Sequence, residues 1–439
     1  MESLPNWLPA NDDQRTLLHN EVHARPPARI HLPALVTYVA VFNEGITREE
    51  ECAHLRLLPG HESLAPEALQ ANFLRLRCPG YTLKWERHTE FSRYSMVQEL
   101  PEGCGLGSCE PDLLAHLITP PGWLAGIPGR TIAAVHLAMV EADIALPDRA
   151  LAQARTWLGD HTVVASLMGN NAHSMAVTDF WLRPCGFERM MVIAPPETSQ
   201  TRAGRIAARL LELETYRLMA LRALPVVKDL APLLADSERQ LTGITAQLEN
   251  KTASDQSLLD TLVSLAGGVE RATAENVYRF SATRAYDNLV AQRIGELREQ
   301  PIPGTQTLGE FLQRRLLPAM ATVTATAQRL ASLSERIART SALLRTRVDI
   351  ATELQNQELL AKLTRGQDLQ LNLQTTVEGL SIAAISYYVV SLLLYLGKAG
   401  KAMGLPVNPE MAAGALIPLV LWAVWRTTKK IHEKLHAGH

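Results

Sequence analysis

The pattern of hydrophobic and polar positions divides the chain into three parts. As far as about residue 195, short apolar stretches rich in β-branched residues recur between prolines and glycines, a pattern typical of strands. From about Thr201 the strand pattern stops, and apolar residues recur at helical spacing among Ala, Leu, Arg, Glu and Gln. Beyond residue 376 two long uncharged runs follow. The pattern predicts an α+β cytoplasmic domain, then an all-α helical and coiled-coil stalk, then two C-terminal transmembrane helices.

Six stretches in the first part have the length and composition of strands. They are residues 34–42, 81–98, 130–140, 162–169, 174–182 and 187–194, the second of which alternates like a pair of half-buried strands. Short helices are expected between them, at Ala65–Leu76 and Asp148–Leu158. Because regular strand–helix–strand units are few, we predict an α+β sheet domain.

The helical part contains breaks that predict about four helices. The breaks are Pro225, Gly267-Gly268 and Pro301–Gly304. In the last helix, apolar residues recur at steps of three, four and seven, as in a coiled coil: Leu330, Leu333, Ile337, Leu344, Val348, Ala351 and Leu354. Only Pro318 and Gly366 interrupt this pattern before the first uncharged run. Residues 319–396 are therefore expected to form one helix, on the order of 115 Å long.

The two uncharged runs have the composition of membrane spans. Gly379–Leu396 has 18 residues, which with a few flanking residues can cross a hydrocarbon core of about 30 Å. Met411–Trp425 has only 15, and taken alone it also fits a buried or interfacial helix. Trp422 and Trp425, followed at once by basic residues, favour a second span, because both kinds of residue suit the membrane interface.

Basic residues beside the two runs predict the orientation. The tail carries Arg426, Lys429, Lys430 and Lys434, whereas the loop between the runs carries Lys398 and Lys401, countered by Glu410. The N-terminal sequence has neither a basic start nor an apolar run, so no signal peptide is predicted. Both termini are expected in the cytoplasm, with a short external loop.

The predicted organisation has seven segments. They are a cytoplasmic α+β domain (1–198), a helical domain (199–304), a long stalk helix (305–376), transmembrane helix 1 (377–397), an external loop (398–410), transmembrane helix 2 (411–426) and a basic cytoplasmic tail (427–439).

Composition narrows the classes of function. The 439 residues have a formal net charge of −2 and are 20% charged, so no excess of positive charge indicates a nucleic-acid partner. Five cysteines, an odd number confined to the first half, are poor material for a disulfide framework and indicate a reducing compartment.

One histidine pair has the spacing of a metal site. His19 and His23 lie four positions apart, with Glu21 between them. In zinc hydrolases the glutamate directly follows the first histidine, whereas here the order is H-N-E-V-H and Pro26 ends any helix. A surface or interdomain contact is therefore favoured over metal binding.

The remaining candidates offer no catalytic arrangement. Gly103–Cys109 (GCGLGSC) lacks the Gly-Lys-Ser/Thr ending of a phosphate loop, and its two cysteines have no second pair to complete a zinc site. Asp179 and the run Glu214–Arg217 fit structural ion pairs as well as chemistry. We expect no enzymatic activity, no cofactor and no metal.

A stripe of small or polar residues crosses into the first uncharged run. Steps of four and three give Asn372, Thr376, Gly379, Ala383, Ser386 and Val390 on one helix face. Polar groups at membrane depth are costly unless they face protein or water. Close helix packing and the lining of a pore in a symmetric oligomer both explain the stripe. For a pore, Lys398 and Lys401 would lie at the outer mouth, and Arg426, Lys429 and Lys430 would form a basic collar.

Four stretches carry a resemblance to a known family. They are NEVHARPP (20–27), TDF (178–180), AGRIAARLLELETYRLMALRALP (203–225) and VEGLSIAAISYYVVSLLLYL (377–396). Together they resemble a family of bacterial membrane-anchored proteins that carry a domain of unknown function, over almost the whole chain. The resemblance implies a place in the bacterial inner membrane and supplies no reaction.

The order of segments also resembles the CorA superfamily of magnesium and zinc transporters. That resemblance implies a homo-oligomer, a pentamer, whose first span lines a pore. The Gly-Met-Asn tripeptide that marks the outer end of that span is missing from residues 395–404, YLGKAGKAMG. The two lysines there would repel cations, so magnesium selectivity is not expected.

These features together predict an oligomeric inner-membrane protein of CorA-like architecture, in contact with the lipid bilayer, that conducts or transports ions. The alternative is a membrane-anchored scaffold or sensor whose cytoplasmic domain binds a partner or a ligand.

Overall fold

The computed structural model describes residues 12–15, 18, 28–159, 161–250, 253–403 and 408–436, the side chains beyond 430 excepted. His19, Glu21, His23 and the rest of NEVHARPP lie outside the described residues. The chain forms two compact units, Met1–Lys251 with Asp260–Arg339, and Thr252–Leu259 with Thr340–His439. We call them the sheet unit and the C-terminal unit and describe each by itself.

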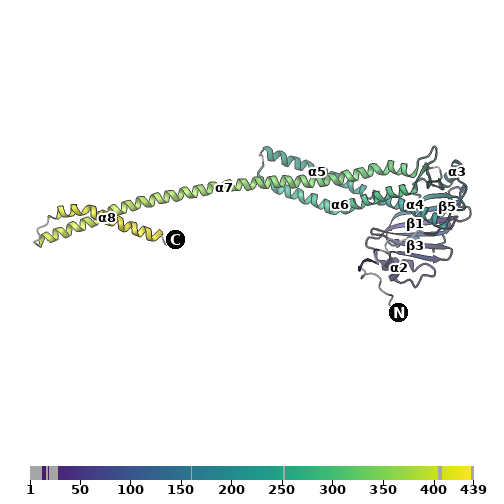
Figure 1. The fold of residues 1–439 in the computed structure, drawn as a ribbon, viewed down its shortest axis with the longest axis horizontal. Helices are drawn as coiled ribbons and strands as arrows, with labels where there is room; N and C mark the ends of the chain where they lie inside the picture. The colour runs from purple at the N-terminus through teal and green to yellow at the C-terminus, as the bar shows by residue number, and fades with distance from the viewer. Residues whose placement is uncertain are drawn as a thin grey trace. The chain divides into compact units, whose positions relative to one another are not determined.

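The sheet unit contains a nine-stranded mixed sheet (Figure 1). Its order is β2-β3-β4-β1-β5-β8-β7-β6-β9, in which the β5–β8 pair is parallel and the other pairs are antiparallel. The strands are β1 Ala34–Phe42, β2 Phe73–Cys78, β3 Tyr81–Arg87, β4 Phe91–Glu99, β5 Arg130–Glu141, β6 Val164–Met168, β7 Ser174–Thr178, β8 Glu188–Ala194 and β9 Gln300–Pro301. Each of the six predicted strand stretches contains strand, and the stretch 81–98 is indeed a hairpin, so the α+β sheet is confirmed.

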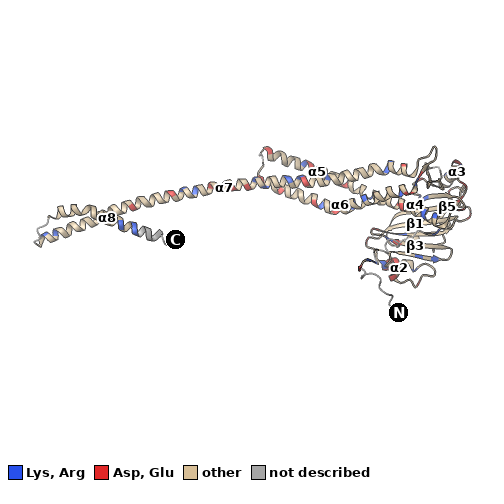
Figure 2. Cartoon of the chain, in the orientation of Figure 1, with Lys and Arg blue, Asp and Glu red and all other residues tan. Residues whose placement is uncertain are grey.

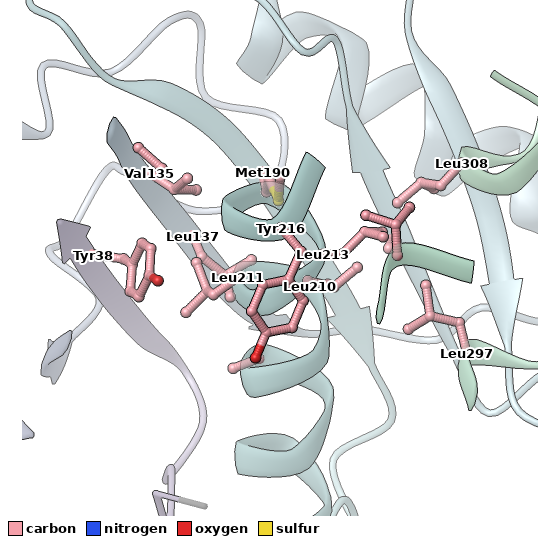
Figure 3. Packing of buried hydrophobic residues seen from close by; sticks show 14 of the residues in the cluster. Tyr38, Val135, Leu137, Met190, Leu210, Leu211, Leu213, Tyr216, Leu297 and Leu308 are labelled. Atoms are coloured by element: carbon pink, nitrogen blue, oxygen red, sulfur yellow. The ribbon is translucent and has the colours of Figure 1, made fainter. Parts of the chain in front are cut away.

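The central strands are buried because helices and loops cover both faces of the sheet. All nine residues of β1 are buried, which explains its unbroken apolar sequence. On one face, residues of β1, β5 and β8 pack against α4 (Gln200–Leu221) and the facing ends of α6 and α7 (Figure 3). On the other face, α3 (Pro147–Leu158), which confirms the helix expected there, buries Trp157 against the sheet. A third cluster holds α2 (Arg48–Leu55) against the half of the sheet formed by β1, β3 and β4.

The helix expected at Ala65–Leu76 is wrong. The chain there forms a short 3-10 helix, Pro66–Leu69, and then enters strand β2. In β2 apolar residues alternate with arginines, and the strand pairs with β3 across a turn at Gly80, whose φ is +80°. Pairing with β3, which begins eight residues after the start of β2, therefore favours a strand here over the helix that the local pattern predicts.

The helical part begins with four helices, as predicted, but one break is misplaced. The helices are α4, α5 Ala223–Asn250, α6 Asp255–Leu297 and α7 Leu308–Ala402, followed by α8 Pro409–His436. Gly267-Gly268 lies inside α6, where a Cβ atom on either residue would have no neighbour within 4 Å. A glycine pair lowers helix stability without ending the helix. Pro318 and Gly366 likewise lie inside α7, and the helix predicted for 319–396 is confirmed within it.

The first turn of α7 is joined to the sheet by hydrogen bonds. Thr307 and Glu310 form a capping box, with Thr307 N–H donating to the Glu310 carboxylate at 3.1 Å and Glu310 N–H to the Thr307 hydroxyl at 3.0 Å. Gly309 N–H donates to the Glu299 carboxylate at 2.9 Å. The Ser166 hydroxyl, on β6, donates to Glu299 at 2.7 Å and accepts from Leu308 N–H at 3.0 Å. These bonds satisfy amides that the helix itself leaves free.

The C-terminal unit holds two helices long and apolar enough to cross a membrane, the end of α7 and α8. They lie side by side (Figure 1), and a Cβ atom on Gly397 would come within 3.2 Å of Pro409. In the most apolar 18-residue segment of each helix, only 6% (α7) and 11% (α8) is buried. Figure 2 shows their uncharged stretches and the lysines and arginine that follow on α8. Length and composition therefore support membrane association, the coarser part of the predicted location.

Candidate functional site: an arginine-lined cavity

A cavity of about 590 Å³ lies in the sheet unit beside the first turns of α4. Three segments meet there: the turn between β6 and β7, the start of α4 and the end of α6. The lining residues, which we call the arginine cavity, are Met168, Gly169, Asn170, Asn171, Ser174, Ser199, Arg202, Arg205, Ile206, Arg209, Glu296, Leu297 and Arg298. Four guanidinium groups and one carboxylate therefore surround one space.

The sequence of α4 explains why three of these arginines share a side. Arg202, Arg205 and Arg209 follow at steps of three and four, which places them along one helix face. The neighbouring face, with Ala203, Ile206, Ala207 and Leu210, is buried against the sheet. The Ser199 side chain caps the helix by accepting from Arg202 N–H. The arginines thus stand at the border between the packed face and solvent.

The rest of the cavity is positioned by contacts between its segments. Gly169, with a φ of +84°, ends β6, and its N–H donates to the Leu297 carbonyl at 2.9 Å. Gln300 Nε2 donates to the Asn170 carbonyl at 3.0 Å. Arg298 adopts the left-handed conformation, with a φ of +50°, which is uncommon for a non-glycine residue. The turn and the end of α6 are therefore held together on one side of the cavity.

Among the described residues, the lining of the cavity carries more positive than negative charge. Arg209 pairs with Glu296 at 3.3 Å. Within the described ranges, no carboxylate forms an ion pair with Arg202, Arg205 or Arg298. Burial and the nearby charge of Arg202 lower the pKa of His173, whose Nε2 lies 3.0 Å from the Thr198 hydroxyl. Such an excess of positive charge favours negatively charged groups nearby.

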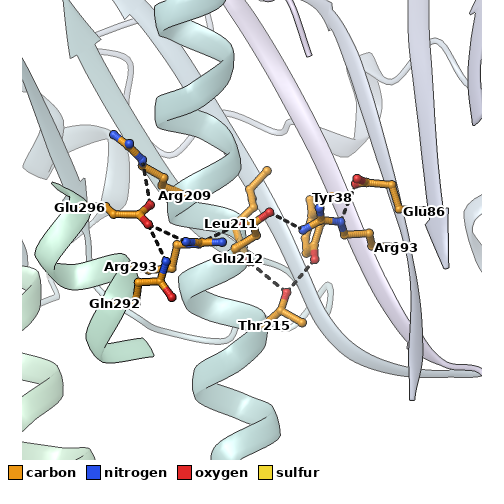
Figure 4. Close-up of polar contacts among 10 residues, drawn as sticks. All are labelled: Tyr38, Glu86, Arg93, Arg209, Leu211, Glu212, Thr215, Gln292, Arg293 and Glu296. Carbon is orange, nitrogen blue, oxygen red and sulfur yellow. Dashed lines mark hydrogen bonds and ion pairs between the residues drawn. The ribbon is translucent and has the colours of Figure 1, made fainter. Parts of the chain in front are cut away.

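A chain of ion pairs leads from the cavity into the sheet (Figure 4). Arg293 contacts Glu296 at 2.9 Å and Glu212 at 2.7 Å, and Glu212 contacts Arg93 at 3.0 Å. Arg93, on β4, also pairs with Glu86 on β3. The flanking carboxylates raise the Arg93 pKa although burial opposes this. This series of ion pairs links α4 and α6 to the sheet. The buried charges in it are stable only because each has a partner of opposite charge.

A second buried cluster joins two of the sequence stretches that carry the family resemblance. Arg217 contacts Glu214 and also Glu188, the latter at 3.3 Å, and lies 5.3 Å from the Phe180 ring centre. Burial, reinforced by Glu214, raises the pKa of Glu188 to about 8. Asp179 pairs with Arg183 at 2.8 Å. The predicted alternative of structural ion pairs for Asp179 and Glu214–Arg217 fits this arrangement.

The residues predicted to line a pore lie in the C-terminal unit. Asn372, Thr376, Gly379 and Ala383 are exposed, Val390 is half-buried, and Ser386 is 5% exposed. The Ser386 hydroxyl has no hydrogen-bond partner in the part of the chain that is described. The pore assignment stays a prediction.

The basic residues at the ends of the two apolar helices are exposed. Lys398 and Lys401 lie in the last turns of α7. Among the predicted collar residues, Arg426 lies 5.0 Å from the Trp422 ring centre, Lys429 lies 5.2 Å from that of Trp425, and Lys430 is exposed. Such cation–aromatic pairs are typical of helix ends at a membrane surface.

Sequence reasoning missed the arginine cavity, although part of its signal was present. Arg202, Arg205 and Arg209 stand on one face directly after the capping residue Ser199, a pattern that indicates a charged helix edge near a helix start. Nothing in the sequence connects them to Arg298, which lies 89 to 96 residues further along the chain. No group of three or more metal-ligating side chains occurs among the residues that the structure describes.

Comparison with known proteins identifies the family and leaves the reaction open. A search of curated proteins found no match. No transporter family is matched, so the CorA resemblance has no support beyond the order of the segments. A family model does match residues 10–435, almost the whole chain, as the four sequence stretches had indicated. The chain belongs to the family described as "Protein of unknown function (DUF3422)".

Proposed function

We propose that this protein is a membrane-anchored receptor whose sheet unit binds an anionic small molecule in the arginine cavity. The observation that carries the proposal is the gathering of four arginines and one glutamate around a single space of about 590 Å³. The sequence gives ion transport as the first prediction and an anchored sensor as the alternative. We favour the alternative here.

The energetics of the cavity favour an anion. Like charges close together raise the free energy of the folded state, and a bound anion removes that cost while forming charge-assisted hydrogen bonds. Guanidinium groups present planar, forked donors that suit carboxylate and phosphate oxygens. Small-molecule sites commonly occupy about 300–1,000 Å³, and the cavity lies within that range.

The anchor in this proposal is the pair of apolar helices at the C-terminus. Their exposed leucines and tyrosines suit lipid, and Arg426 and Lys429 beside tryptophans suit the cytoplasmic membrane surface. With both termini in the cytoplasm, the sheet unit would meet cytoplasmic metabolites at the inner membrane.

Thermal unfolding of the detergent-solubilised protein tests the receptor proposal. Phosphate, nucleotides and citrate at millimolar concentration should include at least one anion that raises the unfolding temperature at constant ionic strength. The variant Arg202→Glu/Arg205→Glu should lose that shift. Arg149→Glu, which changes the charge of an exposed arginine on α3, should keep it. If no anion stabilises the wild type, the receptor proposal fails.

Ion conduction is a second candidate, supported by the exposed stripe on α7. Asn372, Thr376, Gly379 and Ala383 are left uncovered within a single chain. In a symmetric, pentameric CorA-like oligomer, such a face would either pack against other copies or surround an axis. The second case would require the exposed lysines Lys398 and Lys401 to lie near the outer mouth.

Native mass spectrometry followed by ion flux into vesicles tests conduction. A pentamer with measurable flux, whose ion preference changes in Lys398→Glu/Lys401→Glu, would support it. A monomer or dimer cannot surround an axis with α7 and would rule it out.

A further inference from the structure

We infer that the ligand of the arginine cavity is an organic polyphosphate of nucleotide size, with two or more phosphoryl groups. The inference rests on the proposed receptor function and names the chemical class of its ligand. Charge, size and the distribution of polar and apolar walls each support it.

Charge balance favours more than one phosphoryl group. Four arginines and one glutamate line the cavity, which leaves an excess of three positive charges. A monocarboxylate supplies one negative charge, and a single phosphate monoester supplies about 1.5 to 2 at neutral pH. Two or more phosphoryl groups are therefore needed to balance the site.

The arginines approach from two different segments. Arg202, Arg205 and Arg209 lie on α4, whereas Arg298 follows the last residue of α6. Bidentate guanidinium–phosphate contacts from two directions suit a ligand whose phosphoryl groups are chained together. Glu296, already shared between Arg209 and Arg293, limits how far Arg209 can turn toward the ligand.

The remaining wall suits an organic portion. Met168, Ile206 and Leu297 also line the cavity, and the small parts of these side chains that are exposed give it a narrow apolar strip that the edge of an organic ring can contact. Asn170 and Asn171 add groups able to donate and accept hydrogen bonds at its edge. Inorganic phosphate alone would leave this part of the cavity unused.

The cavity adjoins the start of α7. Arg298 directly precedes Glu299, whose carboxylate accepts from Gly309 N–H. A ligand held by Arg298 would therefore slow the opening of the first turn of α7, where the Leu308 and Gly309 amides are bonded to Ser166 and Glu299. Amide exchange in this segment reports whether binding occurs at the cavity.

Calorimetric titration of the full-length protein in detergent, with ADP, AMP, inorganic phosphate and citrate at one ionic strength, tests the inference. ADP should bind at least about tenfold more tightly than AMP or phosphate, because its second phosphoryl group adds a charge-assisted contact. Arg298→Gln should weaken ADP binding about tenfold, and the exposed α3 variant Arg149→Gln should not. ADP should also slow hydrogen exchange in residues 199–209 and 296–309.

The contrary outcomes separate the two proposals. Citrate binding as tightly as ADP would overturn the polyphosphate class and leave an anion receptor. Equal weakening by Arg298→Gln and Arg149→Gln, or unchanged exchange in residues 199–209 and 296–309, would overturn the cavity as the binding place. Binding of none of the four anions would overturn both the ligand class and the receptor.

Discussion

The two units of this chain treat charged and apolar side chains in opposite ways. In the sheet unit, ionic side chains such as Glu86, Arg93 and Glu214 are almost fully buried. In the C-terminal unit, apolar side chains such as Leu380 and Leu392 are exposed by more than 60%. The first unit buries most of its apolar side chains in three clusters and pairs its buried charges. The second leaves a continuous apolar surface exposed within a single chain.

This difference in burial indicates which contacts stabilise each unit. A buried charge is tolerated only with its partner, so the sheet unit depends on specific contacts within one chain. A continuous apolar surface on a monomer marks a place for lipid or for other protein. The arginine cavity is a different case, because Arg202, Arg205 and Arg298 have no carboxylate partner among the described residues and are not fully buried. This excess of positive charge is the basis for the proposal that a ligand binds there.

Breaking the buried ion pairs should give the largest effect on stability. Arg93→Met removes the guanidinium that Glu86 and Glu212 share and leaves each with one other cation, Lys84 or Arg293. We expect a loss of about 3–5 kcal/mol in the free energy of unfolding. Urea unfolding followed by circular dichroism measures it. The control is Arg329→Met, which removes an exposed pair with Glu238 and should cost no more than about 1 kcal/mol. Equal losses of unfolding free energy in the two variants would mean that burial does not determine how much these ion pairs contribute to stability.

Placing a charge in the exposed apolar surface tests the other side of the comparison. Ile385→Arg puts a guanidinium near the middle of the first apolar run, at an insertion cost of about 2.5–3.5 kcal/mol. The share of protein in washed membranes should fall. Leu373→Arg, at an exposed position before the run, should leave that share unchanged. Unchanged membrane recovery of Ile385→Arg would argue that α7 does not cross the bilayer.

Close packing in the sheet unit predicts a smaller loss at Gly204. A Cβ atom there would lie 1.6 Å from the carbonyl oxygen of Ala28, which crosses α4 at this point. Gly204→Ala should cost about 1–3 kcal/mol, as other overpacked sites do. Gly243→Ala, on α5 with open space around it, should instead stabilise by up to about 1 kcal/mol. Calorimetric unfolding of both variants decides, and a neutral Gly204→Ala would contradict the close approach of Ala28.

One buried carboxylate of the sheet unit, Glu188, gives the stability a dependence on pH. The pKa of Glu188 is raised from 4.5 to about 8, so the folded state holds a proton that the unfolded chain releases. Its stabilising contribution is complete below about pH 4.5 and is lost progressively as the pH rises through 8. Glu188→Gln should remove this fall. Parallel stability curves for wild type and variant between pH 5 and 9 would show that Glu188 does not hold the proton.

Several elements of the fold could be predicted from local pattern. Residues 34–42 were assigned as a strand with the bounds that the structure has, because an unbroken apolar, β-branched run suits a strand buried on both faces. The long helix and the two apolar helices were equally readable, since helical spacing and the absence of charge are local properties. Membership of the family also followed from short stretches of sequence.

What remained hidden depends on contacts between residues far apart in the chain. Phe73–Cys78 became a strand because β3 was available to pair with it, and Gly267-Gly268 did not end α6. The arginine cavity needs the β6–β7 turn, the start of α4 and the end of α6 to meet, and Arg298 joins it only through that meeting. Most elements and the apolar surfaces follow from local sequence alone, because hydrogen bonding and hydrophobic periodicity act over a few residues. Only the tertiary structure decided which charges are paired and which four arginines face one space, because the chain topology sets those distances.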